Sequence, residues 1–264
     1  MKIMVVPDAQ VKPDVPLDHL ECAGRFAAAK KPDVIVNIGD FADVPSLSSY
    51  DIGKKAFEGR RYKADIQAAH LGMLTFMSPI LEEQSRQRKN KERVWKPRLI
   101  LTLGNHEQRI PKAVESDAKL DGVMSIKDLK YEEFGWEVYP FLQPVIVEGV
   151  AFCHYYPSGQ LGRPTVSARA ILNKMHMSCV AGHQQGRDIA YGKRADGKEI
   201  TAIIAGSFYQ HDEAYLSPMT NKHWRGIYVL HAVEEGSFDE MAVSLEFLQR
   251  KYGKSTTGNL ETNS

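Results

Sequence analysis

The chain has 264 residues, of which 43% are hydrophobic, 25% charged and 9% aromatic. This composition is typical of a folded globular protein and excludes a disordered, collagen-like or coiled-coil chain. Lys and Arg total 34 against 33 Asp and Glu, so the net charge of +1 excludes a generally polycationic nucleic-acid coat. Three widely spaced cysteines without a CxxC motif indicate neither a disulfide framework nor a zinc knuckle.

The apolar runs of the chain are short, and none is long enough to span a bilayer. Asp8 interrupts the apolar N-terminal run before the core of a signal peptide can form. We therefore expect a cytoplasmic protein that has no membrane partner.

The first half of the chain alternates apolar strands with helices. Strands are predicted at Lys2–Val6, Asp33–Ile38 and Leu99–Leu103, with helices at Leu17–Lys30 and along an amphipathic stripe between Ile66 and Leu81. The second helix runs into a basic stretch, Arg86–Arg98. Each strand ends in a polar cluster, which is the pattern of a wound α/β sheet with its site at the strand C-termini.

The second half is richer in strands and contains one helix, near Thr165–Met175. The predicted strands are Trp136–Tyr139, Val145–Val147, Val150–His154, Ser178–Ala181, Ile200–Ala205, Gly226–Ala232 and Met241–Phe247. We expect an α/β fold in which two β-sheets pack face to face with helices outside. Residues 1–252 are predicted to form a single domain, followed by a disordered polar tail at 253–264.

Three glycine-led motifs carry the candidate chemistry. They are Gly39-Asp40-x-x-Asp43, Gly104-Asn105-His106-Glu107 and Gly182-His183, and Asp8 and His154 follow strands of their own. A lone Asp after a strand is usually a turn or cap residue, and a lone His is usually a hydrogen-bonded core residue. The order of the motifs and their glycines, which allow sharp backbone turns, instead favour a shared site for divalent cations.

At these residues the sequence resembles the calcineurin-like metallophosphoesterases, and most of all their bacteriophage members. The resemblance rests on Asp8-x-Gln10, GDxxD at 39–43, GNHE at 104–107, His154 and GHQQ at 182–185, and it covers residues 4 to about 207. It implies a two-sheet β-sandwich flanked by helices, in α-β-β-α layers. If the chain is phage-encoded, its compartment would be the host cytoplasm.

The resemblance also implies two adjacent metal positions, bridged by Asp40. The second metal would be completed by Asn105, His154 and His183, and the first would be held by Asp8, Gln10 and Gln185. The family has His at both glutamine positions. Because an amide oxygen is a harder and weaker ligand than imidazole, such a first site would favour Mg²⁺, Mn²⁺ or Ca²⁺ over Zn²⁺. We expect one or two ions of Mn²⁺ or Mg²⁺. The alternatives are an enzyme that uses the second site alone, or a first metal that enters with the substrate phosphate.

The implied reaction is attack on a phosphoester by a metal-activated hydroxide. In the family, the His of GNHE protonates the leaving oxygen and the second Asp of GDxxD orients it, which assigns these roles to His106 and Asp43. A carboxylate that raises the imidazole pKa and fixes its tautomer suits a general acid near neutral pH.

Substrate contacts are predicted from basic segments that contain aromatic residues. Arg60 and Arg61 lie in the first segment, after GDxxD, and Arg86–Arg98 forms a second run. Such a run can equally be a solvated helix end. Further phosphate-binding candidates are Arg109, His211, Lys222 and Arg225, although Arg109 could cap its own helix and the other three could belong to a surface loop.

We therefore expect a metal-dependent phosphoesterase with a phosphoester substrate. A phosphodiester of nucleic acid or a nucleotide is favoured, so DNA or RNA is a candidate partner and nuclease activity a candidate function. The alternatives are a phosphomonoesterase or protein phosphatase, and a catalytically degenerate binding scaffold. The pattern predicts no oligomeric state.

Overall fold

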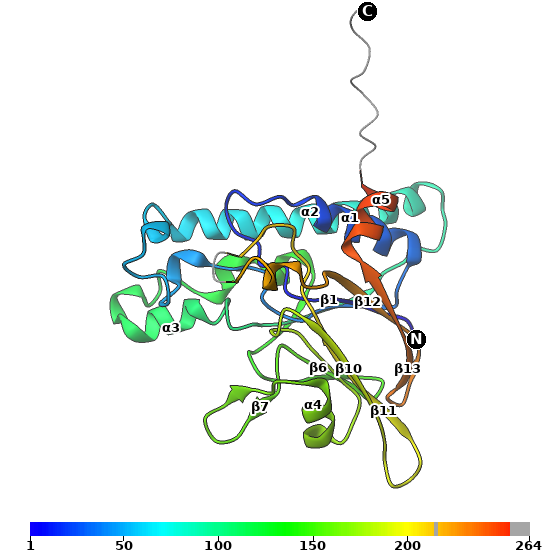
Figure 1. Cartoon of the computed structure of the whole chain (residues 1–264). Coiled ribbons are helices and arrows are strands. Elements are labelled where there is room, and N and C mark those ends of the chain that lie inside the picture. Colours follow the sequence, from blue (N-terminus) through cyan, green and yellow to red (C-terminus); the bar gives the residue numbers. More distant parts are fainter. Residues whose placement is uncertain (214–215, 254–264) are drawn as a thin grey trace, which may run out of the picture.

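The computed structural model describes residues 1–213 and 216–253, so the predicted disordered tail lies outside the described residues except for Gly253. Two mixed β-sheets form the centre of the molecule (Figure 1). The first has the strand order β13(Ser237–Ser244)-β12(Gly226–Glu234)-β1(Ile3–Val6)-β2(Val34–Asn37)-β3(Arg98–Thr102)-β4(Glu137–Tyr139). Within it β1 to β4 are parallel, whereas β12 is antiparallel to β1 and β13.

The second sheet has five strands, in the order β10(Arg187–Lys193)-β11(Glu199–Ala205)-β9(Cys179–Ala181)-β6(Val150–Cys153)-β5(Val145–Val147). Its central strand β9 is parallel to both β11 and β6, and the two edge strands are antiparallel to their neighbours. A small hairpin, β7(Pro157–Ser158) and β8(Arg163–Pro164), lies outside the two sheets.

Three apolar clusters hold these layers together. Alternate side chains of a strand point to opposite faces of its sheet and so belong to different clusters. In β1, Ile3 and Val5 belong to the cluster between the sheets, where Phe152 of β6 and Val180 of β9 also lie. Met4 of β1 belongs instead to the cluster under the helices. Strands buried on both faces read as continuous apolar runs, which is why these strands could be predicted.

Helices cover both outer faces (Figure 1). On the six-stranded sheet lie α1(Asp18–Lys30), α2(Tyr62–Lys89) and α5(Leu245–Tyr252), and α1 packs against the other two. On the five-stranded sheet lies α4(Ala168–Met175), whose Ile171 and Leu172 are buried against it. The expected arrangement of two facing β-sheets with helices on the outside is confirmed. No described helix combines the length and the apolar character that a membrane span needs.

Some predicted elements were wrong or missing. The strand predicted to end at Phe247 ends at Ser244, whose side chain caps α5 by accepting a hydrogen bond from Phe247 N at 3.2 Å. The edge strand β10 was not predicted because its side chains are mostly exposed. Helix α3(Arg109–Ser116) follows the GNHE motif, where a helix was considered for Arg109 but no bounds were predicted.

Candidate metal centre

The carboxyl ends of strands from both sheets meet at one end of the molecule. Asp8 follows β1, Asp40 follows β2, Asn105 follows β3, His154 follows β6 and His183 follows β9. Several contacts join the sheets there, and two of them involve backbone atoms of the loops after β1 and β2. Phe208 N donates to Asp8 O at 2.8 Å, and His154 Nδ1 lies 3.0 Å from Ile38 O. Parallel strands therefore deliver side chains that are far apart in sequence to one place.

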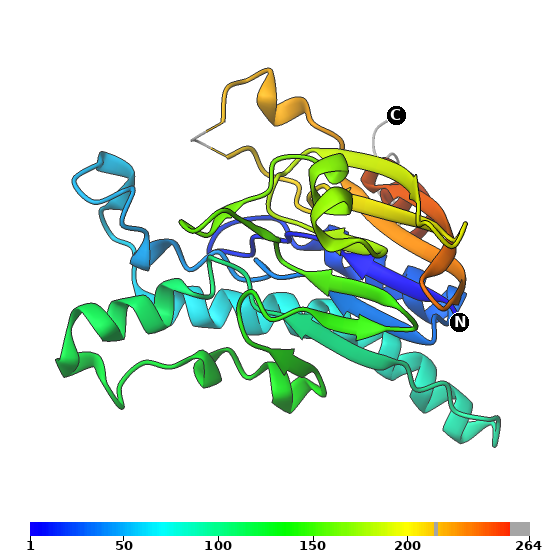
Figure 2. The ribbon, with the colours of Figure 1, turned by 90° about the horizontal axis from the view of Figure 1, so that it is seen from below.

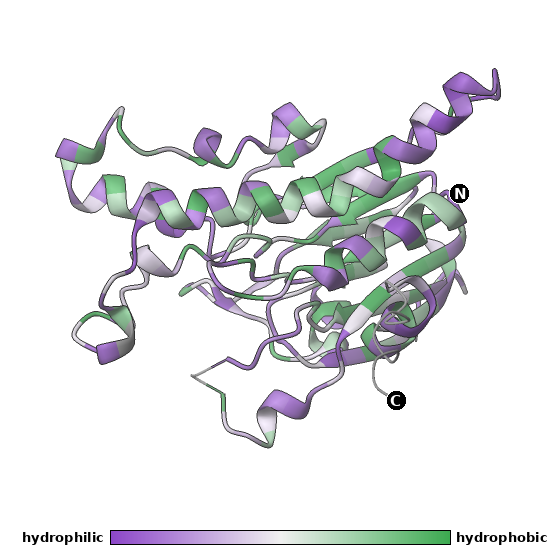
Figure 3. Ribbon diagram, turned by 90° about the horizontal axis from the view of Figure 1, so that it is seen from above, coloured by the Kyte–Doolittle hydropathy of each residue, from purple (hydrophilic) through white to green (hydrophobic). Residues whose placement is uncertain are grey.

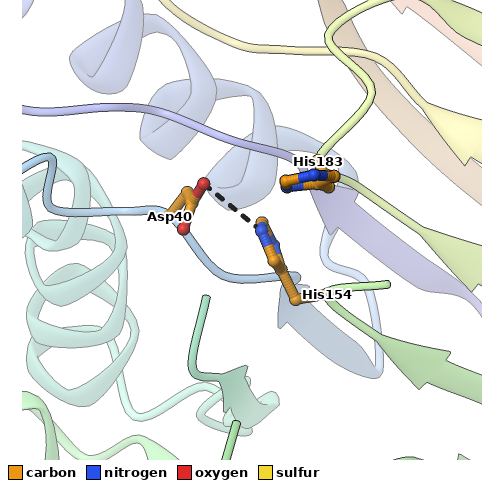
Figure 4. A group of neighbouring side chains, drawn as sticks. All are labelled: Asp40, His154 and His183. Atoms are coloured by element: carbon orange, nitrogen blue, oxygen red, sulfur yellow. Dashed lines mark ion pairs between the residues drawn. The ribbon is translucent and has the colours of Figure 1, made fainter. Parts of the chain in front are cut away.

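Asp40, His154 and His183 point toward one another (Figure 4). One ligand atom from each lies within 4.8 Å of the others, a spacing that could hold a metal ion. Asn105 lies among them, because its Oδ1 is 2.9 Å from His154 Nε2 and 2.7 Å from His183 Nδ1. His154 Nε2 is also 3.3 Å from Asp40 Oδ2.

These separations fit a metal coordination shell. With metal–ligand bonds of about 2.1 Å, neighbouring ligand atoms of a tetrahedral or octahedral site lie roughly 3.0–3.4 Å apart. The separations of 2.7, 2.9 and 3.3 Å in the structure lie close to that range. The outer shell fits as well, since a His that binds a metal through one ring nitrogen usually donates the other N–H to a carbonyl. Ile38 O accepts in that way from His154 Nδ1.

The charges of these side chains are coupled, and a metal ion bound by His154 would displace the proton that Asp40 favours on that imidazole. Asp40 is 1% exposed, and its pKa lies below the usual range because the charges of His106 and His154 outweigh its burial. Burial disfavours a charged His154, yet the Asp40 carboxylate raises the pKa of His154 to about 9. Burial and the charge of His154 lower the pKa of His183 to about 4, which keeps that imidazole in the neutral form that binds metals.

Close approach explains two of the glycines. A Cβ on Gly104 would lie 2.1 Å from Asp40 Oδ1 and 2.3 Å from Asp40 N, and one on Gly182 would lie 2.4 Å from Asp8 Oδ1. Either would collide with a carboxylate of the site. Asp40 (φ 49°) and His183 (φ 69°) themselves have left-handed backbone conformations, which cost energy in residues with a side chain and cluster at functional sites.

The residues predicted for the first metal lie beside this cluster. Asp8 is fully buried, and burial raises its pKa to about 7. His183 N donates to both of its oxygens at 3.1 Å, and Gln185 Nε2 donates to Oδ2 at 3.2 Å. The Oε1 of Gln185 accepts from Tyr209 OH at 2.8 Å, so its carbonyl oxygen is already bound.

Gln10 differs from Gln185. Its side chain is fully buried, and within the described part of the chain neither of its amide atoms has a hydrogen-bond partner. Its backbone N–H donates to Asp40 O at 2.9 Å, which places it next to the predicted bridging carboxylate. A buried amide without a partner is costly, so this side chain is suited to a ligand that the chain itself does not supply.

His106 and Asp43 form the second part of the site. His106 Nδ1 lies 2.7 Å from Asp43 Oδ1, and His106 Nε2 lies 3.7 Å from Asp40 Oδ2. Burial opposes charge on His106, but the carboxylates of Asp40 and Asp43 overcome that effect and raise its pKa. The contact with Asp43 leaves Nε2 as the ring nitrogen on the side of the metal ligands.

Two cations hold Asp43 in place. Arg109 Nη1 lies 2.9 Å from Asp43 Oδ1, and Lys12 Nζ lies 3.4 Å from Asp43 Oδ2. Lys12 also donates to Glu213, at 2.7 Å and 2.9 Å to the two carboxylate oxygens. Arg109, predicted as a phosphate clamp or a helix cap, therefore braces the carboxylate beside His106. Lys12 and Glu213 were missed, because a contact across 201 residues leaves no local sequence signal.

Glu107, the last residue of the GNHE motif, links the loops that carry the ligands. Its side chain is fully buried and accepts from Gly104 N at 2.9 Å, Asp40 N at 3.0 Å and Ala42 N at 2.9 Å. Tyr131 OH donates to it at 3.2 Å. One carboxylate thus fixes the turn at Asp40 to the turn at Gly104.

Two loops near this end of the sheets hold the remaining candidates: the loop between β2 and α2, and the loop between β11 and β12. In Figure 2 both project from the body away from the N-terminus. In the first, Arg60 donates to Pro45 O at 3.0 Å and to Asp51 at 2.8 Å, so it stabilises its own loop. Arg61 is exposed and donates to Arg60 O, which leaves much of its guanidinium accessible.

The second loop holds the remaining candidates. His211 Nε2 lies 2.6 Å from Glu213 Oε1, and its ring stacks on Tyr209 at 4.7 Å. Arg225 lies over the Tyr209 ring and donates to Gln210 O at 3.1 Å and Asp212 at 3.2 Å. Lys222 is exposed. His211 and Arg225 therefore stabilise the loop, and Lys222 is the accessible cation of the three.

The second basic run is far from the metal ligands. It begins in the last turns of α2 and ends at Arg98, where β3 starts, whereas Asn105 follows the opposite end of β3. The 28 residues of α2 span about 42 Å at a helical rise of 1.5 Å per residue. The two basic segments therefore do not form one phosphate-binding surface around the site.

The sequence matches no protein-family model and no curated protein.

Proposed function

We propose that this chain is a metal-dependent phosphoesterase of the calcineurin-like metallophosphoesterase type, and that it favours phosphodiesters of nucleic acid or nucleotides. One observation carries the proposal. Ligand atoms of Asp40, His154 and His183 lie within 4.8 Å of one another, and Asn105 Oδ1 lies within 2.9 Å of a ring nitrogen of each His. Beside them, His106 contacts the braced carboxylate of Asp43. The two-sheet architecture with helices outside supports the same assignment.

Asp40, Asn105, His154 and His183 would hold one ion, and Asp8 with Gln10 would supply oxygen ligands for a second. Mn²⁺ or Mg²⁺ suits this mixed set of oxygen and imidazole donors. When bound, such an ion would polarise the phosphoryl group and lower the pKa of a coordinated water. The fully buried and unpartnered amide of Gln10 supports a ligand role for that residue.

His106 acts as the general acid in this proposal. Burial opposes a charge on His106, but the carboxylates of Asp40 and Asp43 outweigh burial and raise its pKa, which favours the protonated form that a general acid needs. The proton leaves from Nε2 to the oxygen of the departing alcohol as the phosphorus–oxygen bond breaks, because Nδ1 faces Asp43. Asp43 keeps the ring oriented, and Arg109 and Lys12 keep Asp43 ionised and in place.

The preference for a diester rests on the basic loop after Asp43. Arg61 and Lys63 are exposed there, at the start of α2. Exposed cations at the rim suit a substrate that continues beyond the reacting phosphate, and a nucleic-acid strand is such a substrate.

The test is metal reconstitution of the purified protein with Mn²⁺, Mg²⁺, Ca²⁺ and Zn²⁺. Calorimetry would give the stoichiometry, while turnover of bis-p-nitrophenyl phosphate and p-nitrophenyl phosphate is followed in parallel. We expect diester turnover that falls about 10²–10⁴-fold in His106→Ala with metal stoichiometry unchanged. His231→Gln, on β12, is the matched control and should keep full activity.

Other results would contradict parts of the proposal. Full activity of His106→Ala would refute the acid role. A faster rate on the monoester would identify a phosphomonoesterase or phosphatase instead. Metal binding without turnover of either substrate would favour the binding scaffold, a function that the engaged carbonyl of Gln185 also suits.

A further inference from the structure

The far end of α2 and the turn after it carry a group of cations that the proposed reaction does not use. In Figure 3 this end of the helix is largely hydrophilic and extends beyond the body of the molecule. We call this group the distal cationic cluster; it consists of Arg88, Lys89, Lys91, Arg93 and Lys96. All five side chains are exposed, and none has an ion pair or hydrogen bond within residues 1–213 and 216–253.

Two acids near the cluster, Glu83 and Glu92, are paired with other residues. Arg86 pairs with Glu83 at 2.7 Å and with Glu92 at 2.8 Å, and Glu83 also contacts Lys31 at 2.8 Å. Glu92 is the only acidic residue between 86 and 98. The five cations of the cluster therefore keep a positive potential of their own, although the net charge of the whole chain is only +1.

The cluster has a defined backbone. Gln87 is buried, and its Oε1 accepts from Trp95 N at 2.8 Å, while Trp95 Nε1 donates to Pro32 O at 2.7 Å. Lys91 has a left-handed conformation (φ 56°) that turns the chain back after the helix. Favourable interaction with the helix dipole could account for Arg88 and Lys89 in the last turn, but not for the three cations beyond it.

We propose that the distal cationic cluster is a docking surface for the phosphate backbone of a nucleic acid. The choice of nucleic acid among polyanions rests on the proposed function, because a nucleic-acid phosphodiester is its favoured substrate. Five exposed cations along nine residues match a regularly spaced polyanion. Trp95 is half-buried and committed to Pro32 O, so the cluster presents charge and no aromatic face for stacking on bases. Docking is therefore independent of base sequence.

The position of the cluster makes docking depend on the length of the nucleic acid. About 42 Å separates the two ends of α2, a span that corresponds to about 12 base pairs at 3.4 Å each. A duplex shorter than this cannot contact both the cluster and the exposed cations at the start of α2. Long substrates would gain affinity from the cluster, and short ones would react as small diesters do.

The test compares two triple variants with the same change in net charge. Lys89→Gln, Lys91→Gln and Arg93→Gln remove part of the cluster, whereas Lys193→Gln, Arg194→Gln and Lys198→Gln remove cations from the β10–β11 hairpin. Fluorescence anisotropy measures binding of a labelled 30-nucleotide oligothymidylate, a 30-base-pair duplex and a 6-nucleotide control at several salt concentrations. Turnover of bis-p-nitrophenyl phosphate is measured on the same preparations, and circular dichroism checks folding.

We expect the cluster variant to bind both 30-mers at least tenfold more weakly than the hairpin variant. For the single strand, the slope of the logarithm of the binding constant against the logarithm of salt concentration should be shallower by about 2 in the cluster variant. The reason is that each of the three lost phosphate contacts contributes about 0.7 to this slope. Equal binding by the two variants would overturn the inference. So would a wild-type protein that binds phosphatidylserine vesicles or polyglutamate but neither oligonucleotide. Absence of diester turnover in the wild type would count against the proposed function alone, because anisotropy reports docking without catalysis.

Discussion

Replacing Glu107 by Gln tests whether one buried carboxylate holds together the turns that carry the candidate metal ligands. The carboxylate accepts four hydrogen bonds, from Gly104 N and Asp40 N on one oxygen and from Ala42 N and Tyr131 OH on the other. Gln has nearly the same shape and volume, so packing is unchanged. What changes is that one of the two acceptor atoms becomes an NH₂ donor.

The size of the effect follows from these four partners. The least damaging orientation turns the NH₂ toward Tyr131, whose hydroxyl can rotate and accept. Ala42 N then faces a donor and loses its partner, which costs about 1–3 kcal/mol for a buried group, and the two bonds to the other oxygen lose their charge assistance. Burial and the charge of Asp40 raise the pKa of Glu107, and the neutral Gln is free of both costs, which works in the other direction. We expect a net loss of about 2 kcal/mol of stability.

Urea unfolding measures this loss. With a slope of about 2–3 kcal/mol/M, the midpoint should fall by roughly 1 M. The matched control is Glu115→Gln on α3, the same chemical change at an exposed position, and it should leave the midpoint unchanged. Calorimetry should also show weaker metal binding in Glu107→Gln, since both Asp40 N and Gly104 N are anchored by this side chain. A variant with wild-type stability and wild-type metal affinity would refute the reasoning.

Two further predictions concern pH and metal selectivity. Burial lowers the pKa of His19 to about 4 in the folded protein, below its value of about 6.5 in the unfolded chain. As the pH falls from 6.5 toward 4, the unfolded chain therefore binds a proton at His19 before the folded protein does. This difference lowers the free energy of unfolding by at most about 3 kcal/mol, and no such loss occurs above about pH 6.5. His19→Gln should therefore lose less stability than the wild type between pH 7.5 and 4.5 in urea titrations, and an equal loss in both proteins would contradict this. The second prediction concerns metal selectivity. The double variant Gln10→His with Gln185→His should bind a second equivalent of Zn²⁺ in calorimetry, whereas the control Gln10→His with Gln184→His should not. An unchanged Zn²⁺ stoichiometry in the first double variant would contradict the assignment of Gln10 and Gln185 to the first metal.

The strands and the metal-ligand motifs could be predicted because both leave local signals. A strand buried on both faces is a short apolar run, as at Val34–Asn37, and the residue after it lies at the sheet edge. The glycines of the motifs mark backbone that approaches a carboxylate too closely for a Cβ, as Gly104 does at Asp40. The grouping of Asp40, His154 and His183 therefore agrees with the expectation from sequence.

The groups that position these residues could not be predicted, because they depend on contacts between distant segments. In the sequence, Lys12 has the character of an ordinary surface lysine, and only the fold places Glu213 next to it. Arg109 was expected to bind phosphate or cap its helix, and its contact with Asp43 requires the position of a loop 66 residues earlier. The exposed edge strand β10 lacks the apolar alternation that identified its neighbours.

The loop that begins at Tyr209 connects the two unusual features of this site. Tyr209 OH donates to the carbonyl oxygen of Gln185, one of the two glutamines found where the resembling family has imidazoles. The ring of Tyr209 stacks on His211, which contacts Glu213, and Glu213 holds the Lys12 that contacts Asp43. One continuous set of contacts therefore joins Gln185, at the predicted first-metal position, to the carboxylate behind His106. A His at 185 would lose the acceptor that Tyr209 uses and loosen this loop, so the glutamine and the loop are best understood as one structural unit.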